Sequence, residues 1–204
     1  MGNDEAFDFL SEIYIKNGFH LYMIGGTSRD FLLGQPYSDL DFCTDATPED
    51  EKGFLPDADY TFAKYGSIKV RFNSFEADVT TLRQEGMYLD SRHPSKITFV
   101  KDPLLDYPRR DFTINAIYLS NDYKVIDYCG GLMDLKEGII RFIGNADKRI
   151  KEDPLRILRA LRFKEKLGFR FDKETELAVE ANRNLISELN PEKVKMELMK
   201  GKKL

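Results

Sequence analysis

The spacing of apolar residues predicts helices and strands in alternation along the first two thirds of the chain. From residue 4 to 17, apolar side chains recur every three or four positions, which predicts a helix that Gly18 ends. An apolar run at 20–24 predicts a strand, and alternation at 67–73 and 75–82 predicts a hairpin. The same reading predicts a helix start at Thr47-Pro48, a polar loop at 83–94, a helix at 111–117, and strands at 123–128 and 139–143.

The pattern changes after Gly144. Helices are predicted at about 145–167 and 173–185, with Gly168 between them, and Pro191 opens a last helix. We therefore predict an α+β head domain over residues 1–143, built on a small mixed sheet with helices, and an all-helical neck domain over residues 144–204.

Composition narrows the class of protein. The chain has 204 residues, 42% of them hydrophobic, and only two cysteines without a CxxC motif. These values fit a globular protein and disfavour a disulfide framework or a structural zinc site. The acidic N-terminus is unlike a signal peptide, and no apolar run reaches membrane-spanning length. We expect a cytoplasmic protein without a membrane partner.

Charge is distributed unevenly along the chain. The net charge is −4, yet residues 1–60 carry 13 acidic and 3 basic residues, while residues 139–170 carry 4 acidic and 10 basic residues. This asymmetry suggests that a polyanion is held at the basic segment and a metal ion near the acidic start. The alternative is that the charges only solvate helix faces.

A double glycine follows the first predicted strand. Gly25 and Gly26 allow the backbone to approach a bulky anion, and Thr27 and Ser28 are placed to cap a helix that runs to Leu33. The N-terminus of such a helix offers free N–H groups, so this segment predicts a phosphate-binding turn.

Two aspartates follow shortly afterwards. Asp39 and Asp41 are two positions apart in a strand-like run, so both carboxylates are expected on one face. Adjacent carboxylates repel unless a cation lies between them, and Mg²⁺ prefers one or two carboxylates together with phosphate oxygens. We predict magnesium and nucleoside-triphosphate chemistry here; the alternative is a pair of surface aspartates.

Four motifs in order carry a resemblance to a known family. They are Gly25-Gly26-Thr27-Ser28-Arg29-Asp30, Asp39-Leu40-Asp41, the run RRDFTINA at 109–116, and Glu152-Asp153-Pro154-Leu155-Arg156. Together they resemble the class II tRNA nucleotidyltransferase and bacterial poly(A) polymerase family, from about residue 20 to 170. The resemblance implies a polymerase-β-like nucleotidyltransferase head followed by a neck.

The resemblance also implies a reaction. It is the transfer of a nucleoside monophosphate from CTP or ATP to an RNA 3′-hydroxyl, with release of pyrophosphate. Asp39 and Asp41 would hold the Mg²⁺ ions of a two-metal mechanism, and Asp78 would be the third carboxylate, as base or metal ligand. The family usually has Glu at this position, and Glu76 lies two residues away on the same strand face.

Other residues are assigned to the triphosphate and the sugar. Gly26 and Arg29 would contact phosphates, although Arg29-Asp30 is also readable as a surface ion pair. Arg110 would reach a phosphate or the ribose, with Asp111 and Asn115 ordering the sugar. Asp111 is equally a good helix N-cap, and both roles are compatible.

The resemblance places base selection in the basic segment. The family reads the incoming base with the Asp and Arg of this motif, here Asp153 and Arg156. A carboxylate accepts from the exocyclic amine of C or A and a guanidinium donates to the ring nitrogen, whereas U and G mismatch both. Arg159 and Arg162 would hold phosphates or lock this template. A plain charged helix face is the alternative.

CCA addition to the 3′ end of tRNA is our first choice of function, with CTP, ATP and tRNA as partners. Poly(A), CC-only and A-only addition are close alternatives. A non-catalytic nucleotide- or RNA-binding module and a transferase acting on proteins or small molecules are less favoured. We expect this chain to lack the body and tail domains of the family, and a fragment, a minimal form, a homo-oligomer and one part of an assembly remain alternatives.

Overall fold

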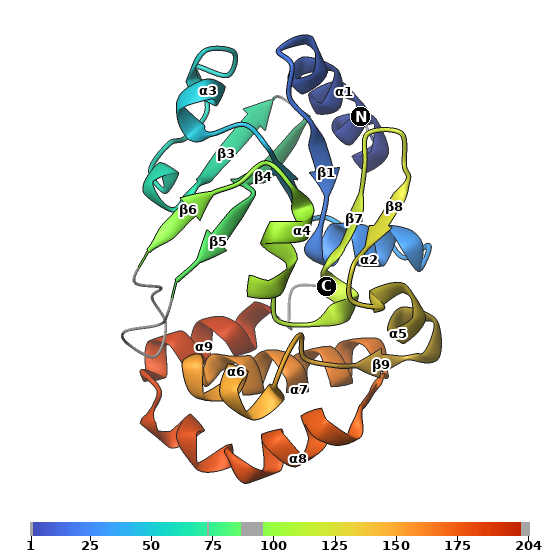
Figure 1. The fold of residues 1–204 in the computed structure, drawn as a ribbon, viewed down its shortest axis with the longest axis vertical. Coiled ribbons are helices and arrows are strands. Elements are labelled where there is room, and N and C mark those ends of the chain that lie inside the picture. The colour runs from blue at the N-terminus through green and yellow to red at the C-terminus, as the bar shows by residue number, and fades with distance from the viewer. Residues whose placement is uncertain (1, 73, 87–95, 201–204) are drawn as a thin grey trace. The chain divides into compact units, whose positions relative to one another are not determined.

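The first elements follow the predicted pattern. The structure is a computed structural model that describes residues 2–72, 74–86 and 96–200. Helix α1 (Asn3–Lys16) is followed by β1 (Leu21–Met23), α2 (Gly25–Leu32), β2 (Leu40–Thr44) and α3 (Pro48–Lys52) (Figure 1). Thr47 caps α3 as expected, because its side chain accepts a hydrogen bond from the Asp50 backbone N–H at 3.3 Å.

The predicted hairpin is confirmed, and the predicted loop after it is partly wrong. Strand β3 (Ser67–Phe72) pairs antiparallel with β4 (Phe75–Thr81). The expected polar loop at 83–94 begins as a strand instead, because β5 (Arg83–Glu85) pairs with β6 (Ile97–Phe99). The rest of that loop, residues 87–94, lies outside the described residues. Short turns connect these strands to their neighbours: η1 (Ala63–Tyr65), α4 (Pro103–Asp106) and η2 (Tyr107–Arg109).

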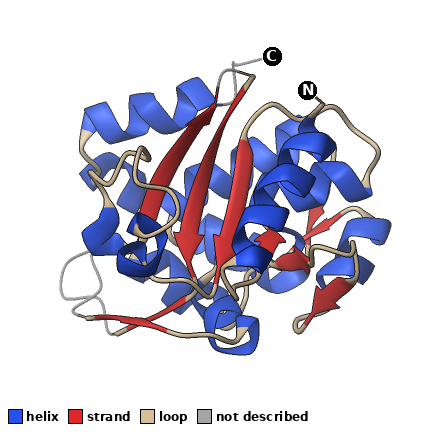
Figure 2. Ribbon diagram, turned by 90° about the horizontal axis from the view of Figure 1, so that it is seen from above, coloured by secondary structure: helices blue, strands red, loops and turns tan. Residues whose placement is uncertain are grey.

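Six strands form a mixed sheet, which confirms the α+β prediction. Strands β7 (Ile117–Leu119) and β8 (Val125–Asp127) complete the order β3-β4-β2-β1-β7-β8. Only the β2–β4 pair within this sheet is parallel. In Figure 2 the longer strands lie side by side. One face of the sheet packs on α1 through buried residues, namely Phe7, Leu10, Tyr14, Leu21, Met23, Leu40, Phe42, Val70 and Val79.

The chain divides into two compact units. The first comprises Met1–Glu85, Ile97–Arg109 and Asn115–Tyr128, and the second Gly86–Lys96, Arg110–Ile114 and Cys129–Leu204. The second unit therefore includes residues 129–143, which the sequence prediction assigned to the head. Phe112 explains why the short middle segment joins it, since its ring packs on Phe142 and Phe163 at centroid distances of 4.7 and 5.6 Å. The boundary between a head and a neck domain at residue 143 stays a prediction.

Helices dominate the second unit. They are α5 (Gly131–Glu137), α6 (Ala146–Glu152), α7 (Leu155–Leu167), α8 (Lys173–Ala181), the 3-10 turn η4 (Arg183–Glu188) and α9 (Pro191–Lys200). A two-stranded parallel pair, β9 (Ile139–Ile140) with β10 (Arg170–Phe171), adds the only strands described in this unit. Within the described residues 144–200, the elements are therefore helices and a 3-10 turn joined by short connections, apart from the two residues of β10.

Two predicted helices differ from the structure. The expected helix at 145–167 is interrupted at Asp153, whose φ of −151° is extended because Pro154 follows and disfavours the helical conformation before it. The expected helix at 111–117 is wrong: a 3-10 turn η3 (Thr113–Asn115) leads directly into β7. Among the described residues, no helix is long and apolar enough to span a membrane.

Candidate active site

The glycine turn packs against two predicted site residues. Gly25 has a φ of +68°, which L side chains rarely adopt, and a Cβ there would lie 3.8 Å from Asp41 Oδ2. A Cβ on Gly26 would lie 3.6 Å from Arg29 Nη2. The turn therefore brings bare backbone to a carboxylate and a guanidinium, as a phosphate-binding segment beside a metal ligand requires.

Thr27 does not cap the helix as predicted. Helix α2 begins at Gly25 after Ile24, which makes no side-chain cap hydrogen bond. The Thr27 hydroxyl instead donates to the Asp39 carbonyl oxygen at 2.9 Å and accepts from the Asp41 N–H at 2.8 Å. Thr27 is 1% exposed. It ties α2 to the backbone of both aspartates, a link that spans 14 residues and that no local pattern indicates. Ser28, the other predicted cap, donates to the Gly25 carbonyl at 3.3 Å.

Two of the three predicted carboxylates are neighbours across strands. Asp41 in β2 is the register partner of Asp78 in the parallel strand β4, where adjacent strands are about 4.8 Å apart. Asp41 is exposed while Leu40 and Phe42 point into the core, so the carboxylates lie on the opposite face of the sheet. Asp39 is exposed and precedes β2 by one residue.

This arrangement fits Mg²⁺ through two carboxylates rather than three. Within the described ranges, no three His, Cys, Asp or Glu side chains are grouped closely enough to hold a metal ion. Asp39 and Asp41 remain the exposed pair beside the glycine turn. Two carboxylates with phosphate oxygens are a normal ligand set for Mg²⁺. The Asp78 carboxylate is instead engaged by Lys69, with Nζ 3.2 Å from Oδ1.

Lys69 belongs to a chain of ion pairs on the same sheet face. Its Nζ also lies 2.9 Å from Glu76 Oε1, and Arg71 Nε donates to Glu76 Oε2 at 2.6 Å. The hydrogen bond to Glu76 is the main cause that raises the pKa of Lys69 above its usual value. Hydrogen bonds from Lys69 and Arg71 lower the pKa of Glu76. Lys69 is thus a protonated cation beside Asp78 that the motifs did not reveal.

Arg29 lies in a buried polar contact and is not part of a surface ion pair. Its side chain is 2% exposed. Nε donates to Asp30 Oδ1 at 2.7 Å, and Nη1 donates to Asn115 Oδ1 at 2.8 Å across 86 positions of sequence. Asn115, expected at the sugar, holds Arg29 in place. The guanidinium nevertheless lies against Gly26, where a phosphate is predicted.

Asp111 is the centre of a charge network in the second unit. Arg156 Nε donates to Asp111 Oδ1 at 2.7 Å, and Arg159 Nη1 lies 2.6 Å from Oδ2. Burial alone would raise the pKa of Asp111, but the charges of Arg159 and Arg156 and the Arg156 hydrogen bond hold the pKa below its usual value. Its carboxylate fastens two arginines rather than capping a helix.

The predicted base-reading residues meet around this network. Arg156, 2% exposed, also donates from Nη1 to the Arg149 carbonyl at 2.6 Å and to Glu152 Oε2 at 3.0 Å. Asp153, 7% exposed, accepts from Arg159 Nη2 at 2.5 Å and from the Leu155 N–H at 3.2 Å. Asp153 has extended backbone at the break before Pro154, and its carboxylate pairs with Arg159. Glu152, which the motif contains but to which the sequence assigned no role, and Arg149, which lies outside the motif, are further members of the network.

The remaining two arginines have different partners. Arg162 donates from Nε and Nη2 to Glu197 Oε1 in α9 at 3.1 and 2.9 Å, and it covers the ring of Phe163. Arg110 is half-buried, and its carbonyl oxygen accepts from Arg149 Nη2 at 2.9 Å. The roles assigned to both on phosphates therefore stay predictions.

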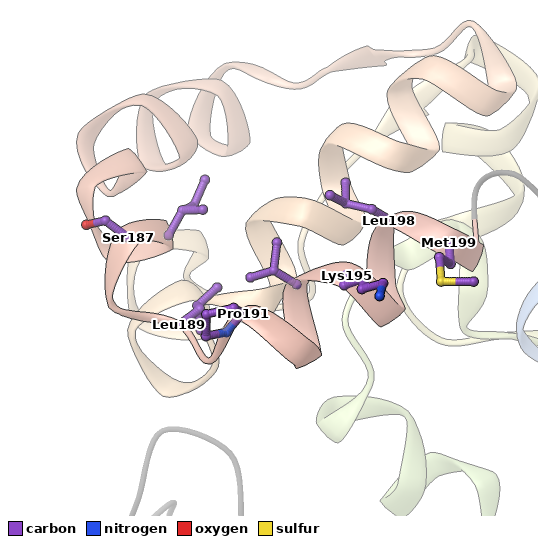
Figure 3. Close-up of a pocket in the computed structure, with 8 residues that line it drawn as sticks. Ser187, Leu189, Pro191, Lys195, Leu198 and Met199 are labelled. Atoms are coloured by element: carbon purple, nitrogen blue, oxygen red, sulfur yellow. The ribbon is translucent and has the colours of Figure 1, made fainter.

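A groove in the second unit contains none of the predicted site residues. Figure 3 shows it between η4 and α9, with a volume of about 550 Å³. Its lining is mainly apolar: Ile186, Ser187, Leu189, Pro191, Val194, Lys195, Leu198 and Met199.

Comparison with known families shows to which family the chain belongs. Residues 21–141, more than half of the chain, match the family model described as the poly A polymerase head domain. The chain belongs to this family. The matched range contains the glycine turn, the aspartates and the Asp111 segment.

Relatives are named CCA-adding enzyme. One from Streptococcus mutans serotype c is 39% identical over 96% of this chain, and one from Geobacillus stearothermophilus is 39% identical over 91%. Among solved structures, the Bacillus stearothermophilus CCA-adding enzyme in complex with CTP has a TM-score of 0.88 at 33% identity and covers 98% of this chain. The Thermotoga maritima CCA-adding enzyme complexed with tRNA has a TM-score of 0.76 at 26% identity, over 98% of this chain.

The relatives are about twice as long as this chain. The chain spans 49% of the Streptococcus mutans enzyme and 49% of the Bacillus stearothermophilus structure.

Proposed function

We propose that this chain carries the nucleotidyl-transfer machinery of a CCA-adding enzyme, which adds C and A from CTP and ATP to the 3′ end of tRNA. The observation that carries the proposal is the likeness, over nearly the whole chain, to a CCA-adding enzyme in complex with CTP. Each of the two units contains the groups that one half of the reaction needs.

The first unit supplies the groups for metal and triphosphate. Asp39 and Asp41 would hold Mg²⁺, which neutralises charge on the triphosphate and lowers the pKa of the attacking hydroxyl. The turn at Gly25 and Gly26 offers backbone N–H groups at the start of α2. Arg29, held by Asp30 and Asn115, places a fixed positive charge beside Gly26. The 3′-hydroxyl of the RNA attacks the α-phosphorus, and pyrophosphate leaves.

The second unit supplies the groups for base selection. Asp153 would accept from the exocyclic amine of C or A, and Arg156 would donate to the neighbouring ring nitrogen. Both side chains now bond to protein partners, Arg159 for Asp153 and Asp111 with Glu152 for Arg156. Base reading therefore requires these contacts to be shared or exchanged. The Asp111 carboxylate holds both Arg156 and Arg159, which favours sharing of these contacts over their exchange.

Poly(A) addition is the second candidate, since the matching family model is described as a poly A polymerase head domain. A base-reading site that accepts both C and A is compatible with CCA addition and with poly(A) addition, because both activities use ATP. The two candidates differ in whether CMP is incorporated at all.

The decisive experiment offers the purified chain labelled CTP, ATP, UTP or GTP with Mg²⁺ and a tRNA that lacks part or all of its 3′ CCA. We expect incorporation of C and then A, with U and G rejected. ATP incorporation alone, in long tails, would favour poly(A) addition. No incorporation with any RNA would leave a nucleotide- or RNA-binding module as the better description.

Replacing Asp39 and Asp41 together by alanine tests the metal assignment. We expect incorporation to be lost while the circular dichroism spectrum is kept. Asp57→Ala, which removes an exposed carboxylate of the same unit that belongs to none of the four motifs, is the control. Undiminished turnover in the double variant would rule out the metal role of these aspartates.

A further inference from the structure

A lysine lies in the row of side chains that crosses the exposed sheet face at the candidate metal site. Lys69 in β3 is the register partner of Asp78 in β4, and Asp78 is the register partner of Asp41 in β2. Three neighbouring strands thus present a cation, a carboxylate and a second carboxylate side by side. All three residues belong to the first unit.

The ammonium group is close to both oxygens of Asp78. Nζ lies 3.2 Å from Oδ1 and 3.5 Å from Oδ2, so it covers the carboxylate rather than one edge of it. Glu76, two positions before Asp78 on the same strand face, competes for the same ammonium at 2.9 Å. Lys69 is two-thirds buried, which limits the positions its ammonium can take.

A divalent cation and this ammonium would need the same carboxylate. A cation held by Asp39 and Asp41 that also used Asp78, the register partner of Asp41, would lie close to Nζ, and like charges at a few ångströms repel appreciably at a partly shielded site. The Asp78 oxygens that face Nζ are also the ones a metal would use. Binding of the metal at Asp78 therefore requires Lys69 to move toward Glu76.

We propose that Lys69 is a positioning residue that competes with the divalent cation for Asp78, and that Glu76 sets the outcome by drawing the ammonium away. The inference rests on the proposed function for the metal site. The proposal explains how the Asp78 carboxylate stays paired when no divalent cation is bound. It also makes the affinity for the metal ion depend on residues of β3 and β4 as well as on the Asp39–Asp41 segment.

The test measures metal binding directly and without RNA. Mn²⁺ is titrated into the full chain with and without CTP, and free Mn²⁺ is followed by its electron paramagnetic resonance signal. Lys69→Met keeps the apolar stem and removes the charge, and we expect the Mn²⁺ dissociation constant to fall about three- to tenfold. Glu76→Gln releases the ammonium to Asp78, and we expect the constant to rise.

The control is Lys52→Met, which removes an equal charge from the same unit at an ion pair with Glu49 in α3. Lys52→Met should leave Mn²⁺ binding unchanged. In an Asp78→Asn background, Lys69→Met should no longer tighten binding, because the contested carboxylate is gone.

An unchanged or weaker Mn²⁺ affinity in Lys69→Met would overturn the proposal, as would a failure of the chain and its variants to bind Mn²⁺. If Lys69→Met fails to fold by circular dichroism, tighter binding in Glu76→Gln would overturn it independently. If Mn²⁺ binding shifts as expected while no RNA is extended, the proposal on Lys69 stands and the proposed function fails.

Discussion

Replacing Thr27 by valine would remove a single buried hydroxyl that joins the glycine turn to the two aspartates. Valine keeps the shape and β-branching of threonine, so the backbone preference of α2 is little changed. What is lost is one bond to the Asp39 carbonyl at 2.9 Å and one from the Asp41 N–H at 2.8 Å. Thr27 is 1% exposed, so no water replaces the hydroxyl on the helix side.

The structure sets the size of the effect. Leaving buried hydrogen-bonding groups without a partner costs about 1–3 kcal/mol each. Asp39 and Asp41 are exposed residues whose backbone groups regain some bonding to water. We therefore expect a total loss of about 1–3 kcal/mol in the free energy of unfolding. The larger effect should be on turnover, because a carboxylate displaced by 1 Å can cost about a hundredfold in rate.

Urea unfolding followed by circular dichroism measures the first quantity, and incorporation of labelled CMP measures the second. Thr27→Ser keeps the hydroxyl and is the matched control. It should retain turnover within about threefold, while Thr27→Val should lose about ten- to hundredfold. Equal activity in the wild type and in Thr27→Val would refute the proposed role of the Thr27 hydroxyl in holding the backbone of the two aspartates. Equal impairment in Thr27→Ser and Thr27→Val would show that the loss of the hydroxyl alone does not explain the effect.

Three further predictions concern other parts of the chain. Burial raises the pKa of Glu51 to about 8 although the hydrogen bond from Tyr14 lowers it, so folding takes up a proton and stability falls as pH rises from about 4.5 toward 8. Glu51→Gln should remove this slope of up to about 1.4 kcal/mol per pH unit, measured by urea unfolding across that range, and an unchanged slope would contradict the assignment. Arg156→Ala should reduce the preference for C and A over U and G more than it raises the KM for CTP. Unchanged base selectivity would reject the role of Arg156 in reading the base. Asp111→Asn should reproduce part of the loss of selectivity. Gly25→Ala should destabilise the fold by about 1–2 kcal/mol because of its positive φ, and an unaffected urea midpoint would show that the turn adapts.

Several elements of the fold could be predicted from the local sequence. One further feature was not predicted, although the same reasoning would have found it. Helix α1, the cap of α3 and the β3–β4 hairpin follow from periodicity and capping, which act over a few residues. The break at Asp153 was also accessible, because a proline restricts the residue before it. The helix expected at 111–117 failed because the segment's apolar residues serve a turn and a strand, which local spacing does not distinguish from a helix.

The sequence by itself determined the chemistry available to this protein: the glycine turn, the paired aspartates and the Asp153–Arg156 motif are all readable in order. Only the tertiary structure decided which groups are partners. Strand register places Asp78 between Asp41 and Lys69, Arg29 meets Asn115 across 86 positions, and Asp111 meets Arg156 across 45. Such contacts depend on how distant segments pair and pack, and no local pattern of residues carries that information.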